Sequence, residues 1–193
     1  MSRKVGLLCL MLGIACLLSA VMLVFYNHWE ENRAENTSKY LLQDVQEKIT
    51  DNLTEDKESS KNMSMVQVDG QACIGVLSIP VLELELPVLT DWSYAKLKIA
   101  PCHYYGTVSE KNFVIAAHNY QSHFGRLTEL QPQDLIMFTE MSGEIQYYEV
   151  VLLETLPGNA VEEMITSGFD LSLYTCTVGG GSRVTVRCNA LEK

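Results

Sequence analysis

The feature that most limits how this chain can fold is an uncharged segment near its N-terminus. No charged residue occurs from Val5 to Tyr26, a run of 22 residues that follows Arg3 and Lys4. As a helix this run is about 33 Å long, which is enough to cross the hydrocarbon core of a bilayer. We expect an uncleaved signal anchor over residues 1–26, with Arg3 and Lys4 in the cytoplasm and the rest of the chain outside.

Two other N-terminal signals fit parts of this segment. A cleaved signal peptide has a shorter apolar region, of about 7–15 residues, and needs a small-x-small cleavage site. No such site follows Phe25. A lipoprotein signal ending at Cys16 would have leucine where Gly13 stands, and the apolar run continues past the cysteine. A mature N-terminus beyond residue 20, or a lipid on Cys16, would overturn the anchor.

The charge of the remaining chain narrows the classes of partner. Removing Arg3 and Lys4 from the 14 basic residues leaves 12 against 24 acidic ones, a net charge of −12. This balance argues against nucleic acid and against an anionic lipid surface as partners. It is compatible with a solvated domain near a cell wall.

Residues 27–71 form a polar segment after the anchor. Its apolar residues recur at three- and four-residue spacing: Leu41, Leu42, Val45, Ile49 and Leu53. This spacing predicts an amphipathic juxtamembrane helix, and residues 51–64 have the composition of a disordered spacer. We expect the segment to be a stalk, with a short coiled-coil dimer as the alternative.

From residue 72 to the C-terminus, short strand-like runs are separated by turn signals. The expected strands are 73–80, 81–89, 112–117, 134–140, 144–156, 171–176 and 182–188. Short helical pieces fit at 91–99, 123–130 and 159–166. Many short strands with few helices indicate an all-β barrel or sandwich, which we expect as one domain over residues 72–193.

The segment LYTCTVGGGSRVTVRC, residues 173–188, places a cysteine and an arginine at matching positions of a predicted hairpin. With a loop of two or four residues, Cys176 lies opposite Arg183 on one face, whereas a three-residue loop would pair Cys176 with Val184. We expect an even-numbered loop, in which the glycines supply the positive φ of a tight primed turn. Arg187 lies roughly 13 Å further along the strand, and we expect it to be solvated or structural. A nearby cation favours thiolate, the nucleophilic form of cysteine, and guanidinium N–H groups can stabilise an oxyanion.

Acyl chemistry at a cysteine also needs a proton carrier for the leaving amine. Among the four histidines, His118 is the best candidate because it ends the apolar strand NFVIAA and begins the loop NYQSHFG. His103 and His123, together with Cys102, fit no standard zinc spacing. We therefore expect no metal and no cofactor, and the acids Glu162 and Glu163 are expected to lie on a helix surface.

Six cysteines raise the question of disulfides. Two lie in the anchor, and Cys73, Cys102, Cys176 and Cys188 follow it. These four could form two disulfides in an oxidising compartment. We expect at least Cys176 to be free, because a nucleophile needs a free thiol.

In their order and spacing, NFVIAAHNYQSHFGRLTEL, YYEV and LSLYTC…SRVTV resemble the sortase family, the membrane-anchored cysteine transpeptidases of Gram-positive bacteria. The resemblance covers roughly residues 72–191 and implies a closed eight-stranded barrel. By position, Cys176 matches the nucleophile, His118 the proton donor and acceptor, and Arg183 the arginine that stabilises the oxyanion or substrate. The residues then expected to contact the substrate are Thr175, Asn119 and His123.

The resemblance also implies a reaction. It is cleavage after the threonine of an LPXTG-like sorting signal through a thioacyl intermediate, with transfer to an amine of a cell-wall precursor or a pilin. The implied partners are the surface proteins that carry the signal. Ser172 stands where the family has the first threonine of T-L-x-T-C, and Ala117 where many members have glycine. The short connection before residue 171 speaks against a subclass with a long insertion there, and no second apolar span follows, unlike in typical pilin polymerases.

Three other classes compete with this interpretation. A papain-like protease would have its cysteine before its histidine, which is the reverse of the order here. An L,D-transpeptidase also pairs histidine with cysteine, but its arginine directly follows the cysteine in an S-H-G-C-type run. A non-catalytic anchored adaptor would not need the thiol, so a Cys176→Ala variant separates an enzyme from an adaptor.

Overall fold

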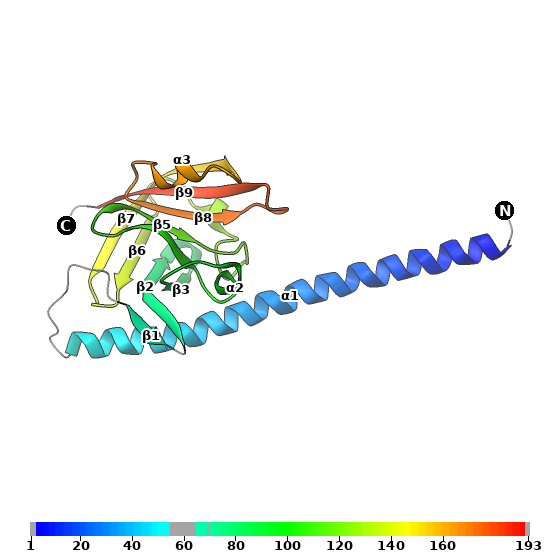
Figure 1. Cartoon of the computed structure of the whole chain (residues 1–193), viewed down its shortest axis with the longest axis horizontal. Coiled ribbons are helices and arrows are strands. Elements are labelled where there is room, and N and C mark those ends of the chain that lie inside the picture. Colours follow the sequence, from blue (N-terminus) through cyan, green and yellow to red (C-terminus); the bar gives the residue numbers. More distant parts are fainter. Residues whose placement is uncertain (1–2, 55–64, 69, 192–193) are drawn as a thin grey trace. The chain divides into compact units, whose positions relative to one another are not determined.

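The computed structural model describes residues 3–54, 65–68 and 70–191 (Figure 1). The chain forms two compact units, residues 1–33 and 34–193. The first unit is the N-terminal part of helix α1 (Arg3–Thr54), and its apolar side chains over residues 7–26 are exposed. This helix is long and apolar enough to be a candidate membrane anchor. Most of the expected spacer lies outside the described residues, and residues 51–54 belong to α1 instead.

The second unit is built on nine strands. They are β1 (Val66–Val68), β2 (Gln71–Ile79), β3 (Leu84–Leu89), β4 (Cys102–Thr107), β5 (Lys111–Ala116), β6 (Leu135–Glu140), β7 (Ile145–Pro157), β8 (Leu171–Cys176) and β9 (Ser182–Ala190). The short helices are η1 (Pro80–Leu82), α2 (Tyr94–Leu97), η2 (Leu127–Glu129) and α3 (Val161–Ile165). All three expected helical pieces are present, each shorter than its predicted range.

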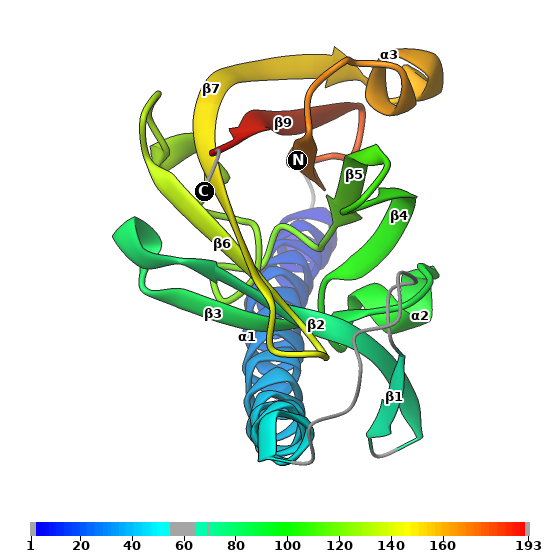
Figure 2. The same ribbon diagram turned by 90° about the vertical axis from the view of Figure 1, so that its left-hand side faces the viewer.

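The strands close into a ring (Figure 2). Their order is β1-β2-β3-β4-β5-β8-β9-β7-β6, and an additional β2–β6 pairing joins the ends of the eight strands that follow β1. The all-β class and the eight-stranded sheet are thus as expected. Three strands differ from the prediction: β1 and β4 were missed, and the run 81–89 is broken because Glu83 has a φ of +51° between η1 and β3.

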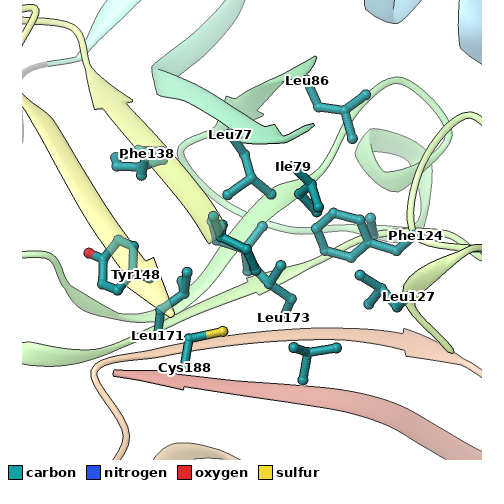
Figure 3. Packing of buried hydrophobic residues seen from close by; sticks show 14 of the residues in the cluster. Leu77, Ile79, Leu86, Phe124, Leu127, Phe138, Tyr148, Leu171, Leu173 and Cys188 are labelled. Carbon is teal, nitrogen blue, oxygen red and sulfur yellow. The ribbon is translucent and has the colours of Figure 1, made fainter. Parts of the chain in front are cut away.

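Large apolar side chains from several strands fill the ring. Figure 3 shows Leu77 of β2, Phe138 of β6 and Leu173 of β8 gathered in one cluster. Phe124 joins them from the β5–β6 connection and is fully buried. The connection that begins at His118 is therefore anchored in the core only a few residues later.

Strands β5 and β8 are parallel neighbours, and this pairing determines where the site lies. Phe113 pairs with Leu171 at one end, and Ala116 pairs with Tyr174 toward the other. The C-terminal ends of the two strands meet at the same edge of the sheet. The residues that follow β5 and those that end β8 are consequently brought together.

The C-terminal part of α1 belongs to the second unit. Leu41, Val45 and Ile49 are buried in one cluster with Val68 of β1 and other residues of the sheet. Burying one such side chain stabilises the fold by roughly 1.5–3 kcal/mol relative to leaving it exposed to water. The amphipathic helix is confirmed, but its apolar face packs on the strands of the same chain. This packing replaces the free stalk and the coiled-coil dimer that the sequence suggested.

Candidate active site

The β8–β9 hairpin places Cys176 and Arg183 side by side. The two residues are directly paired in the antiparallel register. The loop has four residues, 178–181, because the Thr177 N–H donates to the Ser182 carbonyl at 3.0 Å. The expected even-numbered loop is confirmed, and directly opposed residues share one face of the sheet.

The glycines of this loop allow its backbone conformation. Gly179 and Gly180 have φ angles of +88° and +75°, values that residues with a Cβ rarely adopt. The Gly180 N–H donates to the Thr177 carbonyl at 2.8 Å, so the central residues of the turn are Val178 and Gly179. Val178 is not among the described residues with positive φ. The expected primed turn is therefore wrong, and the loop has the pattern of a type II turn.

Cys176 differs from the other cysteines of the second unit in its exposure. Cys73, Cys102 and Cys188 are buried, and burial raises the pKa of their thiols to about 11, about 12 and about 12. Cys176 is half-buried. No described cysteine forms a disulfide. Since reactive thiols need access, Cys176 is the candidate among the cysteines of this unit.

His118 lies at the edge where β5 and β8 end together. The Ala117 N–H donates to the Tyr174 carbonyl at 3.1 Å, which extends the contact beyond β5. Continuing the Ala116–Tyr174 register by two residues puts His118 level with Cys176. Adjacent strands lie about 4.8 Å apart, so imidazole and thiol come from neighbouring positions at one edge.

The guanidinium of Arg183 is held at the hairpin loop. Its Nη1 donates to the Gly180 carbonyl at 2.9 Å and to the Ser182 carbonyl at 3.0 Å. The same loop is tied to the end of β7, because the Gly158 N–H donates to the Gly181 carbonyl at 3.0 Å. No described residue accepts a hydrogen bond from Nε or Nη2 of Arg183, which leaves these donors for a substrate oxygen.

A pocket of about 280 Å³ lies beside Cys176 and Arg183. Four aromatic residues line it, and each ring contacts the next in space. The ring centroids are 5.7 Å apart for Tyr94 and Trp92, 5.7 Å for Trp92 and Tyr104, and 5.3 Å for Tyr104 and Tyr174. Further lining comes from the β7–β8 connection: Pro157, Gly158, Ala160, Val161 and Met164. Sequence reasoning missed this pocket, although aromatic residues cluster near positions 92–105.

Electrostatics also connect this pocket with the hairpin. Burial is the main cause that raises the pKa of Tyr174 well above its ordinary value, and the interaction with Tyr104 adds to the increase. The charge of Arg183 acts in the opposite direction on the same hydroxyl. The Arg183 guanidinium is therefore close enough to interact electrostatically with the Tyr174 hydroxyl, and both residues line the pocket.

Two residues expected to contact substrate are buried instead. Thr175 is 3% exposed, and its hydroxyl donates to the Ala117 carbonyl at 2.9 Å, so it ties β8 to the end of β5. His123 is 0% exposed, and neither ring nitrogen has a hydrogen-bond partner among the described residues. Burial first, and then the charge of His118, lower the pKa of His123 to about 4, against the opposing effect of Glu35. Neither side chain is available at the surface of the pocket.

The loop that carries His118 is compact. The Phe124 N–H donates to the His118 carbonyl at 3.1 Å, and the His118 ring stacks on Tyr120 with centroids 4.8 Å apart. Asn119, the third residue expected to contact substrate, is half-buried in this loop. Gly125 approaches the Asn119 and Tyr120 carbonyls so closely that a Cβ would lie 2.7 Å from each. The position after the histidine is thus fixed by the loop backbone.

Arg187 and His103 are engaged in hydrogen bonds within the protein. Arg187 is 1% exposed and bonded to Glu154 and Ser172, so it is a structural arginine rather than a solvated one. The ring nitrogens of His103 lie 3.1 and 2.7 Å from the carbonyls of Thr90 and Gly106. Within the described ranges no group of three or more His, Cys, Asp or Glu side chains could hold a metal ion.

Comparison with known proteins identifies the fold and the family. A sequence model of the Sortase domain matches residues 77–190, whereas a comparison with curated proteins gives no match. The Clostridium perfringens sortase D5 transpeptidase is similar in structure, with 19% identity, a TM-score of 0.62, and coverage of 81% of this chain and 99% of that chain.

Two further solved structures are similar. The Group B Streptococcus Pilus Island 1 sortase C2 has 21% identity, a TM-score of 0.56, and coverage of 78% of this chain and 98% of that one. A lid mutant of sortase A from Corynebacterium diphtheriae has 20% identity, a TM-score of 0.56, and coverage of 81% and 96%. At these identities the likeness establishes the fold alone. The family follows from the domain match, which spans more than half of the chain and includes His118, Cys176 and Arg183: this chain belongs to the sortase family, whose members are generally transpeptidases of surface proteins.

Proposed function

We propose that this chain is a cysteine transpeptidase that cleaves an LPXTG-like sorting signal and transfers the surface protein to an amine. The observation that carries the proposal is the direct pairing of Cys176 with Arg183 beside the pocket, with His118 two residues beyond the end of the neighbouring strand β5. This set supplies a nucleophile, an oxyanion donor and a proton carrier, which are the parts that acyl transfer needs.

The first half-reaction forms a thioester. The Cys176 sulfur, as thiolate, attacks the threonine carbonyl carbon, and the negative charge moves to the carbonyl oxygen. Nε and Nη2 of Arg183 donate to that oxyanion, in the role that fixed donors have in other acyl-transfer sites. The C–N bond then breaks, and the leaving amine takes a proton from the His118 imidazolium.

The second half-reaction restores the enzyme. An acceptor amine attacks the thioester carbonyl carbon and gives its proton to the now neutral His118. The C–S bond breaks, and Cys176 leaves as thiolate, ready for another turnover. The acceptor is an amine of a cell-wall precursor or a pilin lysine, and solved sortases with similar structure include one from a pilus island.

The proposal extends to architecture and location. The eight-stranded ring is a closed barrel of the sortase type in the domain over residues 72–193, and the C-terminal part of α1 packs against it. The apolar part of α1 crosses the cell membrane once, with Arg3 and Lys4 on the cytoplasmic side. The active site then faces the outside, where sorting-signal proteins and cell-wall amines are found.

A coupled assay tests this function. The full chain in detergent micelles is incubated with an LPXTG-type peptide and an amine acceptor, and mass spectrometry follows the transfer product and the acylated enzyme. The wild type should give both species, and Cys176→Ala should give neither. Transfer by the Cys176→Ala variant, or an acyl group on another cysteine, would contradict the assignment.

A further inference from the structure

One side of the pocket is a helix too short to be stable alone. Helix α3 contributes Val161 and Met164 to the pocket lining, yet it has only five residues and no side chain caps its N-terminus. Helices of this length are not stable in isolation, because nucleation is costly and few hydrogen bonds repay it. Something outside the helix must hold Val161 and Met164 where they line the pocket.

Arg187 provides that support at the C-terminal end of α3. Its Nη2 donates to the Glu163 carbonyl at 2.8 Å, and its Nη1 donates to the Met164 carbonyl at 3.3 Å. The last carbonyls of a helix have no partner within the helix, and a cation there interacts favourably with the helix dipole. The guanidinium therefore acts as the C-terminal cap of α3.

The same guanidinium is fixed to the sheet. Its Nε donates to the Glu154 carboxylate at 2.7 Å, and its Nη1 donates to the Ser172 hydroxyl at 2.8 Å. Glu154 lies on β7 and Ser172 on β8, while Arg187 itself lies on β9. One side chain thus joins three strands to the helix, and α3 lies next to β9 at the end of β7 (Figures 1 and 2).

Arg187, which supports α3, and the candidate catalytic residues Cys176 and Arg183 lie on the same face of the β8–β9 hairpin. Ser172 pairs with Arg187 and Cys176 pairs with Arg183, so both pairs lie on one face of the hairpin, four residues apart. At the Arg187 end α3 covers this face. At the Arg183 end the face is open to the pocket. The position of α3 therefore sets how far the cover extends toward Cys176.

We propose that Arg187 is a positioning residue for substrate selection: it holds α3 so that the exposed Val161, packed over the buried Met164, forms the contact for an apolar substrate side chain near the scissile bond. This rests on the proposed function. Arg187 does not touch the reacting atoms, so its loss should weaken binding of the substrate and of the transition state equally. That pattern raises KM and leaves kcat unchanged.

The decisive variant is Arg187→Lys, which keeps the charge but cannot reproduce the planar fork of donors. We expect KM for an apolar sorting peptide to rise about tenfold, with kcat within about twofold of wild type, since only uniform binding is lost. Val161→Ala removes the exposed side chain that α3 presents, so it should raise KM similarly. The double variant should show no further rise, because the two changes remove one contact. Arg126→Lys, at an exposed ion pair with Glu129, is the matched control with unchanged KM.

Hydrogen exchange gives a readout that does not depend on turnover. In wild type, the Met164 and Thr166 amides donate to the Ala160 and Glu162 carbonyls. Both should exchange faster in Arg187→Lys and at the wild-type rate in Arg126→Lys. Glu154→Gln keeps an acceptor for Nε and removes the charge, so it should shift KM and exchange in the same direction by a smaller factor. This variant also decides the matter where Arg187→Lys does not fold.

Each outcome has a separate meaning. Unchanged KM in a folded Arg187→Lys or Glu154→Gln, fully additive effects with Val161→Ala, or a fall in kcat alone would overturn the positioning role. Unchanged exchange in α3 would overturn the support itself. Absence of turnover by wild type on any sorting peptide would instead overturn the proposed function, and substrate selection with it, while the exchange data would still test the contact between Arg187 and α3.

Discussion

Histidine, cysteine and arginine each occur in the candidate active site at the edge of the sheet and again at a fully buried position of the second unit. The edge set is His118, Cys176 and Arg183, all half-buried. The interior set is His123, Cys188 and Arg187, none more than 1% exposed. Each pair has the same intrinsic chemistry, so the difference between the sets comes from burial and bonding alone.

The interior set shows what burial does to these groups. The pKa of Cys188 is raised to about 12 and that of His123 lowered to about 4, because burial disfavours the charged form of each. Each guanidinium nitrogen of Arg187 donates to an oxygen atom of the protein: Glu154, Ser172 and the Glu163 carbonyl. Groups of this kind contribute to stability and position. The edge set keeps access to substrate, and matched variants of the two sets can test the contrast.

The largest contrast is expected between the two cysteines. Cys176→Ala should abolish both the acyl-enzyme and the transfer product, since no other group of the edge set can form the thioester. Cys188→Ala should keep its activity and lose only stability, because it leaves a small cavity in the core. Mass spectrometry of each variant with a sorting peptide measures this. Acylation of the Cys176→Ala enzyme would break the comparison.

The two histidines should differ almost as much. His118→Ala should nearly abolish turnover, because the leaving amine would have no proton donor, and general acid catalysis contributes about 10²–10⁴-fold. His123→Leu fills a similar volume and should keep kcat at neutral pH. Steady-state rates of both variants at pH 7.5 give the test. Equal losses in the two would show that His118 acts through the loop structure rather than through its proton.

The two arginines follow. Arg183→Ala should reduce kcat/KM on the order of 10²–10³-fold, as the loss of one oxyanion donor does elsewhere. Arg183→Lys should recover little, because a point charge does not reproduce two fixed N–H groups. Arg187 variants should change KM instead of kcat. A folded but inactive Arg187→Ala beside an active Arg183→Ala would reverse the assignment of the two arginines.

Much of the edge set could be predicted because strand registers follow from short-range rules. The four-residue loop fixed Cys176 opposite Arg183, and an even number of loop residues was enough to predict it. His118 could be placed because an apolar strand ended immediately before it. The strand β4 escaped prediction because its sequence, CHYYGT, lacks a clear alternation and contains Gly106 at a φ of +69°.

The interior set could not be predicted, because it depends on contacts between distant segments. Nothing near Arg187 in the sequence indicates Glu154, or the carbonyls of α3, as its partners. His123 stood in a polar loop and was expected near substrate, but Phe124 draws that loop into the core. The docking of α1 likewise involves distant segments, among them Val68 of β1, a three-residue strand with too little pattern to detect.

The buried His123 should also make stability depend on pH. An imidazole unfolded in water titrates near about 6.5, whereas in the folded chain its pKa is about 4. Above pH ~6.5 both states are neutral and the histidine has no effect. As the pH falls below that value, the unfolded chain binds a proton that the folded chain excludes. Stability should therefore fall with decreasing pH, by about 3 kcal/mol over the whole window down to pH ~4.

This pH effect is the smallest contrast that we predict between the two sets, and His123→Leu isolates it. Between pH 7.5 and pH 5.5, wild type should lose about 1.4 kcal/mol more than the variant, because one pH unit below the unfolded pKa corresponds to that amount. Urea unfolding of the full chain in detergent micelles at the two pH values measures the difference. The charge of Glu35 favours the protonated ring and that of His118 opposes it. Glu35→Gln should therefore lower the folded pKa further, which deepens the loss only near and below pH ~4 and leaves the change between pH 7.5 and pH 5.5 almost the same. Parallel pH profiles for wild type and His123→Leu would show that the imidazole is not buried as described.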